Sequence, residues 1–153
     1  MKDLEDIIKE WSDEVIEKIK FNLDSTGTTA SGETKRSLEM VWINNGFQIV
    51  GRPYFRGVEE GRPGGGIPRN FTNILYDWAE AKGILSKFGT EESEQRSALF
   101  LVGQFIKHHG TQLYIKGGRE DIYSNVINEE LPKLMEMIEG RVEETIIKEL
   151  NIN

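Results

Sequence analysis

The segment 51–70 limits the fold of this 153-residue chain more than any other part of its sequence. It contains six of the sixteen glycines and three of the four prolines. Glycine raises the entropic cost of ordering the backbone, and proline removes an N–H donor from any helix or sheet. We therefore predict that this segment is mostly loop and that it separates two parts of the chain with regular secondary structure.

The part before this segment predicts one long helix followed by a β-hairpin. Over residues 2–23 the apolar side chains recur at helical spacing, namely Leu4, Ile7, Ile8, Trp11, Val15, Ile19 and Leu23. Residues 24–32 are small and polar and indicate a loop. Apolar segments at 37–43 and 47–50 flank the turn sequence Asn44-Asn45-Gly46, which permits a positive φ. This arrangement is typical of a hairpin.

The part after the segment predicts helices. Apolar residues at helical spacing indicate one helix over 70–82 and another over about 94–109, each followed by a glycine that can end it. The second helix is expected to turn four apolar side chains inward: Leu99, Val102, Phe105 and Ile106.

The order of the elements predicts an α+β fold in a single domain over residues 1–153. After an extended stretch at 111–115, a helical pattern runs from about 121 to 150. Pro132 either kinks this last helix or opens a separate final one. We expect a long N-terminal helix packed on a small antiparallel sheet, an extended Gly/Pro-rich loop and C-terminal helices.

Composition excludes several classes of protein. Cysteine is absent, which excludes disulfides, thiolate metal sites and a cysteine nucleophile. The longest apolar run, at 98–102, has five residues, far below the roughly 20 that a membrane-spanning helix needs. The first ten residues mix charged and apolar side chains and lack the apolar core of a secretory signal. We expect a soluble, intracellular protein with no membrane partner.

The formal net charge of −7 comes from the two ends of the chain. Residues 1–20 hold seven acidic and four basic side chains, and residues 129–150 hold seven acidic and three basic ones. Nonspecific DNA binding depends on neutralising phosphates, so acidic ends argue against it. The simplest interpretation is that both ends present solvated helix faces.

The sequence contains no recognisable catalytic or cofactor-binding pattern. The glycine-rich run 61–66 continues as Ile-Pro-Arg, whereas a phosphate loop requires Gly-Lys-Ser/Thr entering a helix. His108 and His109 are adjacent, so on a helix they point about 100° apart and do not chelate one ion together. Glu59 and Glu60 are also neighbours, and no second acidic residue lies at a spacing that would indicate a catalytic pair of carboxylates. We expect no enzymatic activity, no cofactor and no metal, and keep a hydrolase that uses either histidine as a third hypothesis.

Four arginines recur through the Gly/Pro-rich segment beside two aromatic residues. The basic residues are Arg52, Arg56, Arg62 and Arg69, and the aromatic ones are Tyr54 and Phe55. A basic, aromatic loop can contact nucleic acid. Arginine and tyrosine are also enriched where proteins contact one another. Both a protein–protein interface and a nucleic-acid interface stay open at this point, and the first is favoured.

Several short motifs resemble one family of phage proteins. The segment 51–62 (GRPYFRGVEEGR) resembles the signature of tail-completion, or head–tail joining, proteins of tailed phages and prophages. Upstream, 31–38 (SGETKRSL) is similar to the lead-in of that family. Residues 74–84 (ILYDWAEAKGI) and 105–111 (FIKHHGT) are similar to segments of its prophage members. The likeness extends in layout over about 1–150.

The resemblance implies a structural virion protein of the phage neck. Such proteins share a long helix packed on a small antiparallel sheet, with an extended loop that reaches neighbouring copies. Copies would form a ring, expected to be six- or twelve-fold, between the portal-side connector protein and the tail or tail-tube protein. Genomic DNA would pass through the lumen without sequence-specific binding. The protein would assemble in the cytoplasm of a bacterial host and reside in the virion.

By position, the resemblance makes 51–70 a protruding interface loop. Glu59 would pair with an arginine of the same or a neighbouring subunit. The residues expected at the subunit interface are Tyr54, Phe55, Arg56, Glu59, Glu60, Arg62 and Arg69. The alternative is a small nucleic-acid-binding module that uses the arginine-rich loop.

Overall fold

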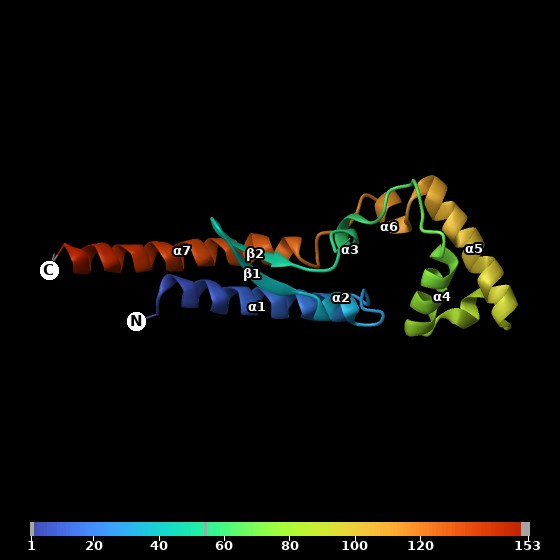
Figure 1. Cartoon of the computed structure of the whole chain (residues 1–153), viewed down its shortest axis with the longest axis horizontal. Helices are drawn as coiled ribbons and strands as arrows, with labels where there is room; N and C mark the ends of the chain where they lie inside the picture. The colour runs from blue at the N-terminus through green and yellow to red at the C-terminus, as the bar shows by residue number, and fades with distance from the viewer. Residues whose placement is uncertain (1, 54, 151–153) are drawn as a thin grey trace.

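Two long helices, α1 (Leu4–Ser25) and α7 (Ser124–Glu149), form the frame of the molecule. In this computed structural model, which describes residues 2–53 and 55–150, the two helices lie side by side and run antiparallel (Figure 1). Hydrogen bonds join the end of α1 to the start of α7 and the start of α1 to the far part of α7. The amide of Asn22 donates to the carbonyl of Ile122 at 2.9 Å, and Arg141 Nε donates to the carbonyl of Lys2 at 2.8 Å.

The sequence of α1 explains both its start and its buried face. The Asp3 side chain accepts a hydrogen bond from the N–H of Asp6 at 2.8 Å and so caps the first turn. The helix then buries Trp11, Ser12, Val15, Ile16, Ile19 and Leu23, one face at a helical period. The predicted helix over 2–23 is confirmed, displaced by two residues.

A β-hairpin lies beside the helix pair and packs on α1. Strands β1 (Glu39–Ile43) and β2 (Gly46–Val50) are antiparallel, and Ile43 pairs with Gly46 across the tight turn. The ring of Phe47 lies between two tryptophans, with its centroid 6.0 Å from that of Trp11 and 6.2 Å from that of Trp42. Phe47, Met40 and Ile49 pack against the buried face of α1. The predicted hairpin is confirmed.

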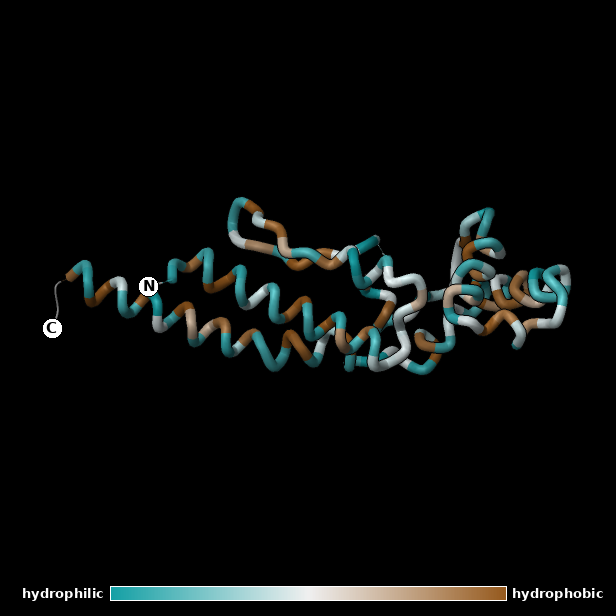
Figure 2. Tube along the Cα trace, turned by 90° about the horizontal axis from the view of Figure 1, so that it is seen from below, coloured by the Kyte–Doolittle hydropathy of each residue, from teal (hydrophilic) through white to brown (hydrophobic). Residues whose placement is uncertain are grey.

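A second lobe stands at the other end of the molecule (Figures 1 and 2). It contains α4 (Phe71–Ala81), the 3₁₀ turn η1 (Leu85–Phe88), α5 (Glu92–His109) and α6 (Gln112–Ile115). Its core is separate from that of the helix pair and consists of Phe71, Leu75, Ala79 and Leu99. Because Gly103 has no side chain, the Phe71 ring lies close to the backbone of α5.

The shortest elements were not expected. The stretch predicted to be extended at 111–115 is the helical turn α6, because the Thr111 side chain accepts a hydrogen bond from the N–H of Tyr114 and caps it. Two further single turns, α2 (Glu33–Arg36) and α3 (Gly57–Glu60), flank the hairpin. Isolated turns of this length carry too little periodicity to be read from sequence.

Pro132 lies inside α7, which is one continuous helix of 26 residues. Proline removes one backbone hydrogen bond from a helix interior. Glu130 and Leu134, on either side of it, are buried against α1, so packing holds both halves in line. The prediction of an α+β fold with a long N-terminal helix on a small antiparallel sheet is confirmed. Within the described residues, no helix is both long enough and apolar enough to cross a membrane.

Glu130 connects α7 to α1 through buried polar contacts. Its side chain is about 3% exposed, and its carboxylate accepts from Lys18 Nζ at 2.5 Å and from Lys133 Nζ at 2.9 Å. Its backbone carbonyl accepts from Trp11 Nε1 at 2.9 Å. The hydrogen bonds from Lys18 and then Lys133 hold the pKa of the Glu130 carboxyl below its ordinary value of 4.5.

We predict that Glu130 makes the protein sensitive to acid. A carboxyl whose pKa is lower in the folded state contributes stability above its unfolded pKa, and that stability is lost as the pH falls through the folded pKa. The free energy of unfolding of the Glu130→Gln variant should therefore lie below wild type at pH 7, and the gap should narrow below about pH 4.5. Urea titrations between pH 7 and pH 3 measure this gap. A gap that stays constant with pH would contradict the assignment.

A second prediction concerns the core of the helix pair. Ile19→Ala removes a fully buried side chain and should lower the free energy of unfolding by about 2–5 kcal/mol. Phe21→Ala is the matched control, because the Phe21 ring is 70% exposed on the same helix and its loss should cost no more than about 0.5 kcal/mol. Denaturant unfolding followed by circular dichroism measures the free energy of unfolding of both variants. Equal losses of stability in the two would be inconsistent with the described core.

Candidate functional site

The Gly/Pro-rich segment 51–70 joins the two lobes and is bonded to the chain that follows α5 (Figure 1). The N–H of Thr111 donates to the carbonyl of Arg62 at 2.9 Å, and the N–H of Arg119 donates to the carbonyl of Glu59 at 2.8 Å. The N–H of Gly65 donates to the carbonyl of Lys107 at 2.8 Å. These bonds make the segment a brace between the lobes, and its exposed residues are 52, 53, 56, 60, 63–66 and 68–70.

Two glycines permit the close approach of these backbones. Gly61 has a φ of +74°, and a Cβ there would collide with the backbone of Tyr114. Gly110 has a φ of +85°, and a Cβ there would lie 2.5 Å from the carbonyl oxygen of Arg62. Only glycine satisfies both the left-handed conformation and the lack of space. The glycines that predict a loop therefore also allow that loop to be held against its neighbour.

Glu59 is the most buried residue of the segment and is 2% exposed. One carboxylate oxygen accepts from the N–H groups of Ile122, Tyr123 and Ser124, at 3.0, 2.7 and 2.9 Å. The other accepts from the hydroxyl of Ser124. These amides open α7 and have no partner within the helix, so a negative charge here satisfies them and complements the helix dipole.

The expectation that Glu59 pairs with an arginine of the same subunit is therefore wrong. Its contacts are with backbone amides and one hydroxyl of the same chain, where it is buried. Its place at a subunit interface stays a prediction. The motif at 51–62 contains Glu59, but it does not show that the carboxylate turns inward to the start of a helix more than sixty positions later.

The other described residues predicted at the interface lie on or near the surface. Phe55 is partly buried and its ring stacks at a tilt on that of Tyr123, 5.4 Å between centroids. Arg56 and Glu60 are exposed and form an ion pair of 3.0 Å across one helical turn. Arg69 is exposed, and Tyr54 lies outside the described residues. Their role at a subunit interface stays a prediction.

Most of the arginines are already engaged within the chain. Arg62 donates to the carbonyl of Gly66 at 2.6 Å and its guanidinium lies 5.2 Å from the centroid of the Phe71 ring. Arg52 forms an ion pair of 2.7 Å with Glu33. A guanidinium that is paired and stacked has fewer donors left for phosphate. This arrangement favours a structural use of the basic segment over a nucleic-acid interface.

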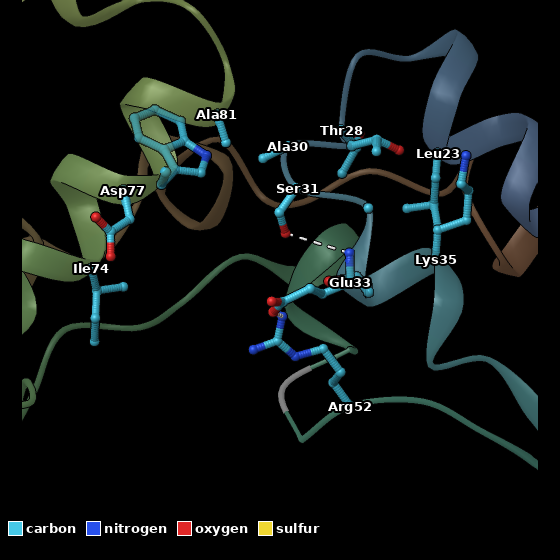
Figure 3. Close-up of a pocket in the computed structure, with 14 residues that line it drawn as sticks. Leu23, Thr28, Ala30, Ser31, Glu33, Lys35, Arg52, Ile74, Asp77 and Ala81 are labelled. Carbon is cyan, nitrogen blue, oxygen red and sulfur yellow. Dashed lines mark hydrogen bonds and ion pairs between the residues drawn. The ribbon is translucent and has the colours of Figure 1, made fainter.

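A polar cleft lies between the lobes, beneath the loop that follows α1. Its volume is about 450 Å³, and its walls come from residues 28–35, Arg52 and the outer face of α4. Figure 3 shows Asp77 and Ile74 of α4 facing Ser31, Glu33 and Arg52 across it. Hydrogen bonds from Lys35 and Thr29 hold the pKa of Asp24, beside this loop, below its ordinary value.

Three charged groups in the wall of the cleft form ion pairs within the chain. Glu33 is bonded to Arg52, and Lys35 to Asp24 at 2.9 Å. His108 and His109 lie elsewhere, exposed on the last turn of α5, and the ring of His109 packs on Phe105 at 4.7 Å between centroids. Across 2–53 and 55–150, no group of three His, Asp or Glu side chains is placed to hold a metal ion.

An apolar groove runs between α4 and α5 on the second lobe. Its volume is about 740 Å³, and Phe71, Ile74, Trp78 and Phe105 are among its walls, with Arg62 at one side. Phe105 was expected to face the core, yet it is 44% exposed, because one face of α5 is already filled by Leu99 and α4 is too short to cover a second. Leu101 and Phe100 on α5 are also exposed.

A second apolar surface lies at the opposite end of the molecule, on the last turns of α7. Val142, Ile146, Ile147 and Leu150 are all exposed there. The acidic side chains of this segment predict a solvated helix face, so this apolar surface was not predicted. The four-residue spacing of Val142, Ile146 and Leu150 was the signal that could have indicated it.

We predict that Glu59 contributes more to stability than its exposed neighbour Glu60. Glu59→Ala leaves three amides at the start of α7 without their acceptor and should lower the free energy of unfolding by about 2 kcal/mol or more. Glu60→Ala removes a surface ion pair and should cost at most about 1 kcal/mol. Urea unfolding of both variants at pH 7 provides the comparison. Equal effects would contradict the capping role of Glu59.

Comparisons with known proteins identify no relative of this chain, so its function is inferred from its own residues. The chain matches no protein-family model, no curated protein and no solved structure. The resemblance to head–tail joining proteins therefore rests on the short motifs described above, and what it implies about function is a proposal.

Proposed function

We propose that this chain is a structural virion protein that forms a ring in the phage neck, joining the portal-side connector to the tail and letting DNA pass. The motifs at 51–62, 31–38, 74–84 and 105–111 support this assignment to the head–tail joining family. Copies of the chain are the principal partners, with the connector protein on one side and the tail or tail-tube protein on the other. The protein acts as an assembled part of the virion, not as a catalyst.

The observation that carries the proposal is the position of the exposed apolar surfaces. One lies in the groove between α4 and α5, and the other on the last turns of α7, at the opposite end of an elongated subunit (Figure 1). Exposed apolar patches of this kind are typical of protein–protein contacts. Two different surfaces on one subunit produce head-to-tail contacts, which close into rings when the rotation between copies permits.

The charge of the chain is consistent with a DNA conduit. The net charge is −7, and the acidic side chains concentrate on α1 and α7. An acidic wall repels phosphate weakly and lets DNA slide, whereas a basic wall would hold it. The brace at 51–70 keeps the two lobes in a fixed relation, which a subunit needs if the same contact is to repeat around a ring.

The oligomeric state of the purified chain tests this proposal. We predict that light scattering after size exclusion shows species that grow with concentration toward six- or twelve-fold multiples of the 17.5 kDa subunit. Negative-stain images of the largest species should show closed rings with a hole wide enough for duplex DNA.

A DNA-binding assay at low salt distinguishes the alternative. A protein that stays monomeric at every concentration, and whose DNA affinity falls with salt and with alanine at Arg56, Arg62 and Arg69, would overturn the proposal in favour of a nucleic-acid-binding module. Rings that show no such affinity would exclude that module.

A further inference from the structure

The end of α7 runs past its antiparallel partner. Arg141 is level with Lys2, since Arg141 Nε bonds to the Lys2 carbonyl, so residues 142–149 extend beyond the start of α1 (Figure 1). Eight residues of α-helix span about 12 Å. We call residues 142–150 the overhang. Among the described residues, only the first turn of α1, with Leu4 and Glu5, borders it.

The overhang carries an apolar stripe. Val142, Ile146 and Leu150 follow one another at four-residue spacing and therefore lie along one side of the helix, where they are 42%, 51% and 63% exposed. Leu4, at the start of α1, borders the same stripe and is also exposed. A helix with apolar residues at this spacing is the form that docks into apolar grooves of other proteins.

The groove between α4 and α5 has the shape and chemistry to receive such a helix. It is lined mostly by apolar side chains, and Phe71, Trp78 and Phe105 form part of its walls. The elements of the lobe itself, over 71–115, hold four Lys or Arg side chains and five acidic ones, so the positive charge at the groove comes from the brace. Arg62 of the brace lies in the wall of the groove.

The overhang has the opposite charge. Residues 136–150 hold five acidic and two basic side chains, and Glu143 and Glu149 lie within the overhang itself. Opposite charge favours docking beside Arg62. Two overhangs packed on one another would bring like charges together, which is unfavourable. Charge therefore selects the groove over a symmetric contact between two overhangs.

Within one subunit, the overhang and the groove lie at opposite ends of the molecule (Figures 1 and 2). The groove of the same chain is therefore out of reach of the overhang, so an overhang that docks there must belong to a second copy. We propose that the overhang of one copy docks, through Val142, Ile146 and Leu150, into the α4–α5 groove of the next copy. This inference rests on the proposed ring and identifies the contact that would build it.

Single substitutions on either side of the contact test the inference. Ile146→Asp places a charge on the stripe, and Phe105→Asp places one in the wall of the groove; both side chains are exposed, so both variants should fold as wild type by circular dichroism. Each should weaken self-association about tenfold to a hundredfold. Phe21→Asp is the control, because Phe21 is exposed but lies on neither surface, and it should leave association unchanged.

Mixing the two variants gives a sharper result. The Ile146→Asp variant retains an intact groove, and the Phe105→Asp variant retains an intact overhang. One copy of each can therefore make a single contact, so an equimolar mixture should form one-to-one dimers but no ring. Rings that form normally from either variant alone would overturn the inference and leave the proposed function standing. A mixture that recovers no dimer would also overturn it.

Cross-linking covers the case in which the wild-type contact is too weak to isolate. The chain has no cysteine, so a double variant with Leu150→Cys and Trp78→Cys carries thiols only at the two proposed surfaces. A short bifunctional maleimide should join copies of it into a ladder of dimers, trimers and larger species. The matched double variant with Phe21→Cys and Leu150→Cys should not form the ladder. Equal cross-linking of the two double variants would overturn the inference. An absence of cross-linking in the variant with Leu150→Cys and Trp78→Cys would also overturn it.

Discussion

The contact between the Glu59 carboxylate and the start of α7 determines how the parts of this molecule are connected. A buried charge is costly unless it is fully hydrogen-bonded, and here three amides and a hydroxyl satisfy it. The same contact supplies the acceptor that the first amides of a long helix need. It thereby fastens the Gly/Pro-rich brace to α7, and α7 in turn pairs with α1. The relation between the two lobes depends on this junction.

The polar interactions lie inside the subunit, while much of the apolar surface lies outside it. Glu59 and Glu130 are buried and bonded, whereas Trp78, Phe105 and Ile146 are exposed. A chain of this length drawn out into two lobes has two small cores and cannot cover every apolar face of its helices. The uncovered faces lie at opposite ends of the subunit, and they are the physical basis for proposing a head-to-tail assembly.

Much of the fold could be predicted because it depends on local pattern. The period of the apolar residues indicated α1 and α5, and Asn44-Asn45-Gly46 indicated the hairpin. Capping by Thr111 produced a helical turn where an extended stretch was expected, since a single turn depends on one hydrogen bond and not on a period. Pro132 left two interpretations open, and packing of its neighbours on α1 selected the continuous helix.

The sequence by itself determined the long helices, the hairpin and the loop between them, since those depend on spacing and on the backbone preferences of glycine and proline. It also determined the acidic ends and the absence of cysteine chemistry. Only the tertiary structure decided what each side chain faces. Glu59 points inward and bonds to amides distant in the sequence. Arg62 lies over the ring of Phe71, and Phe105 lines a groove. The reason is physical: periodicity indicates that a face is apolar, but burial depends on whether another element is long enough and near enough to cover it.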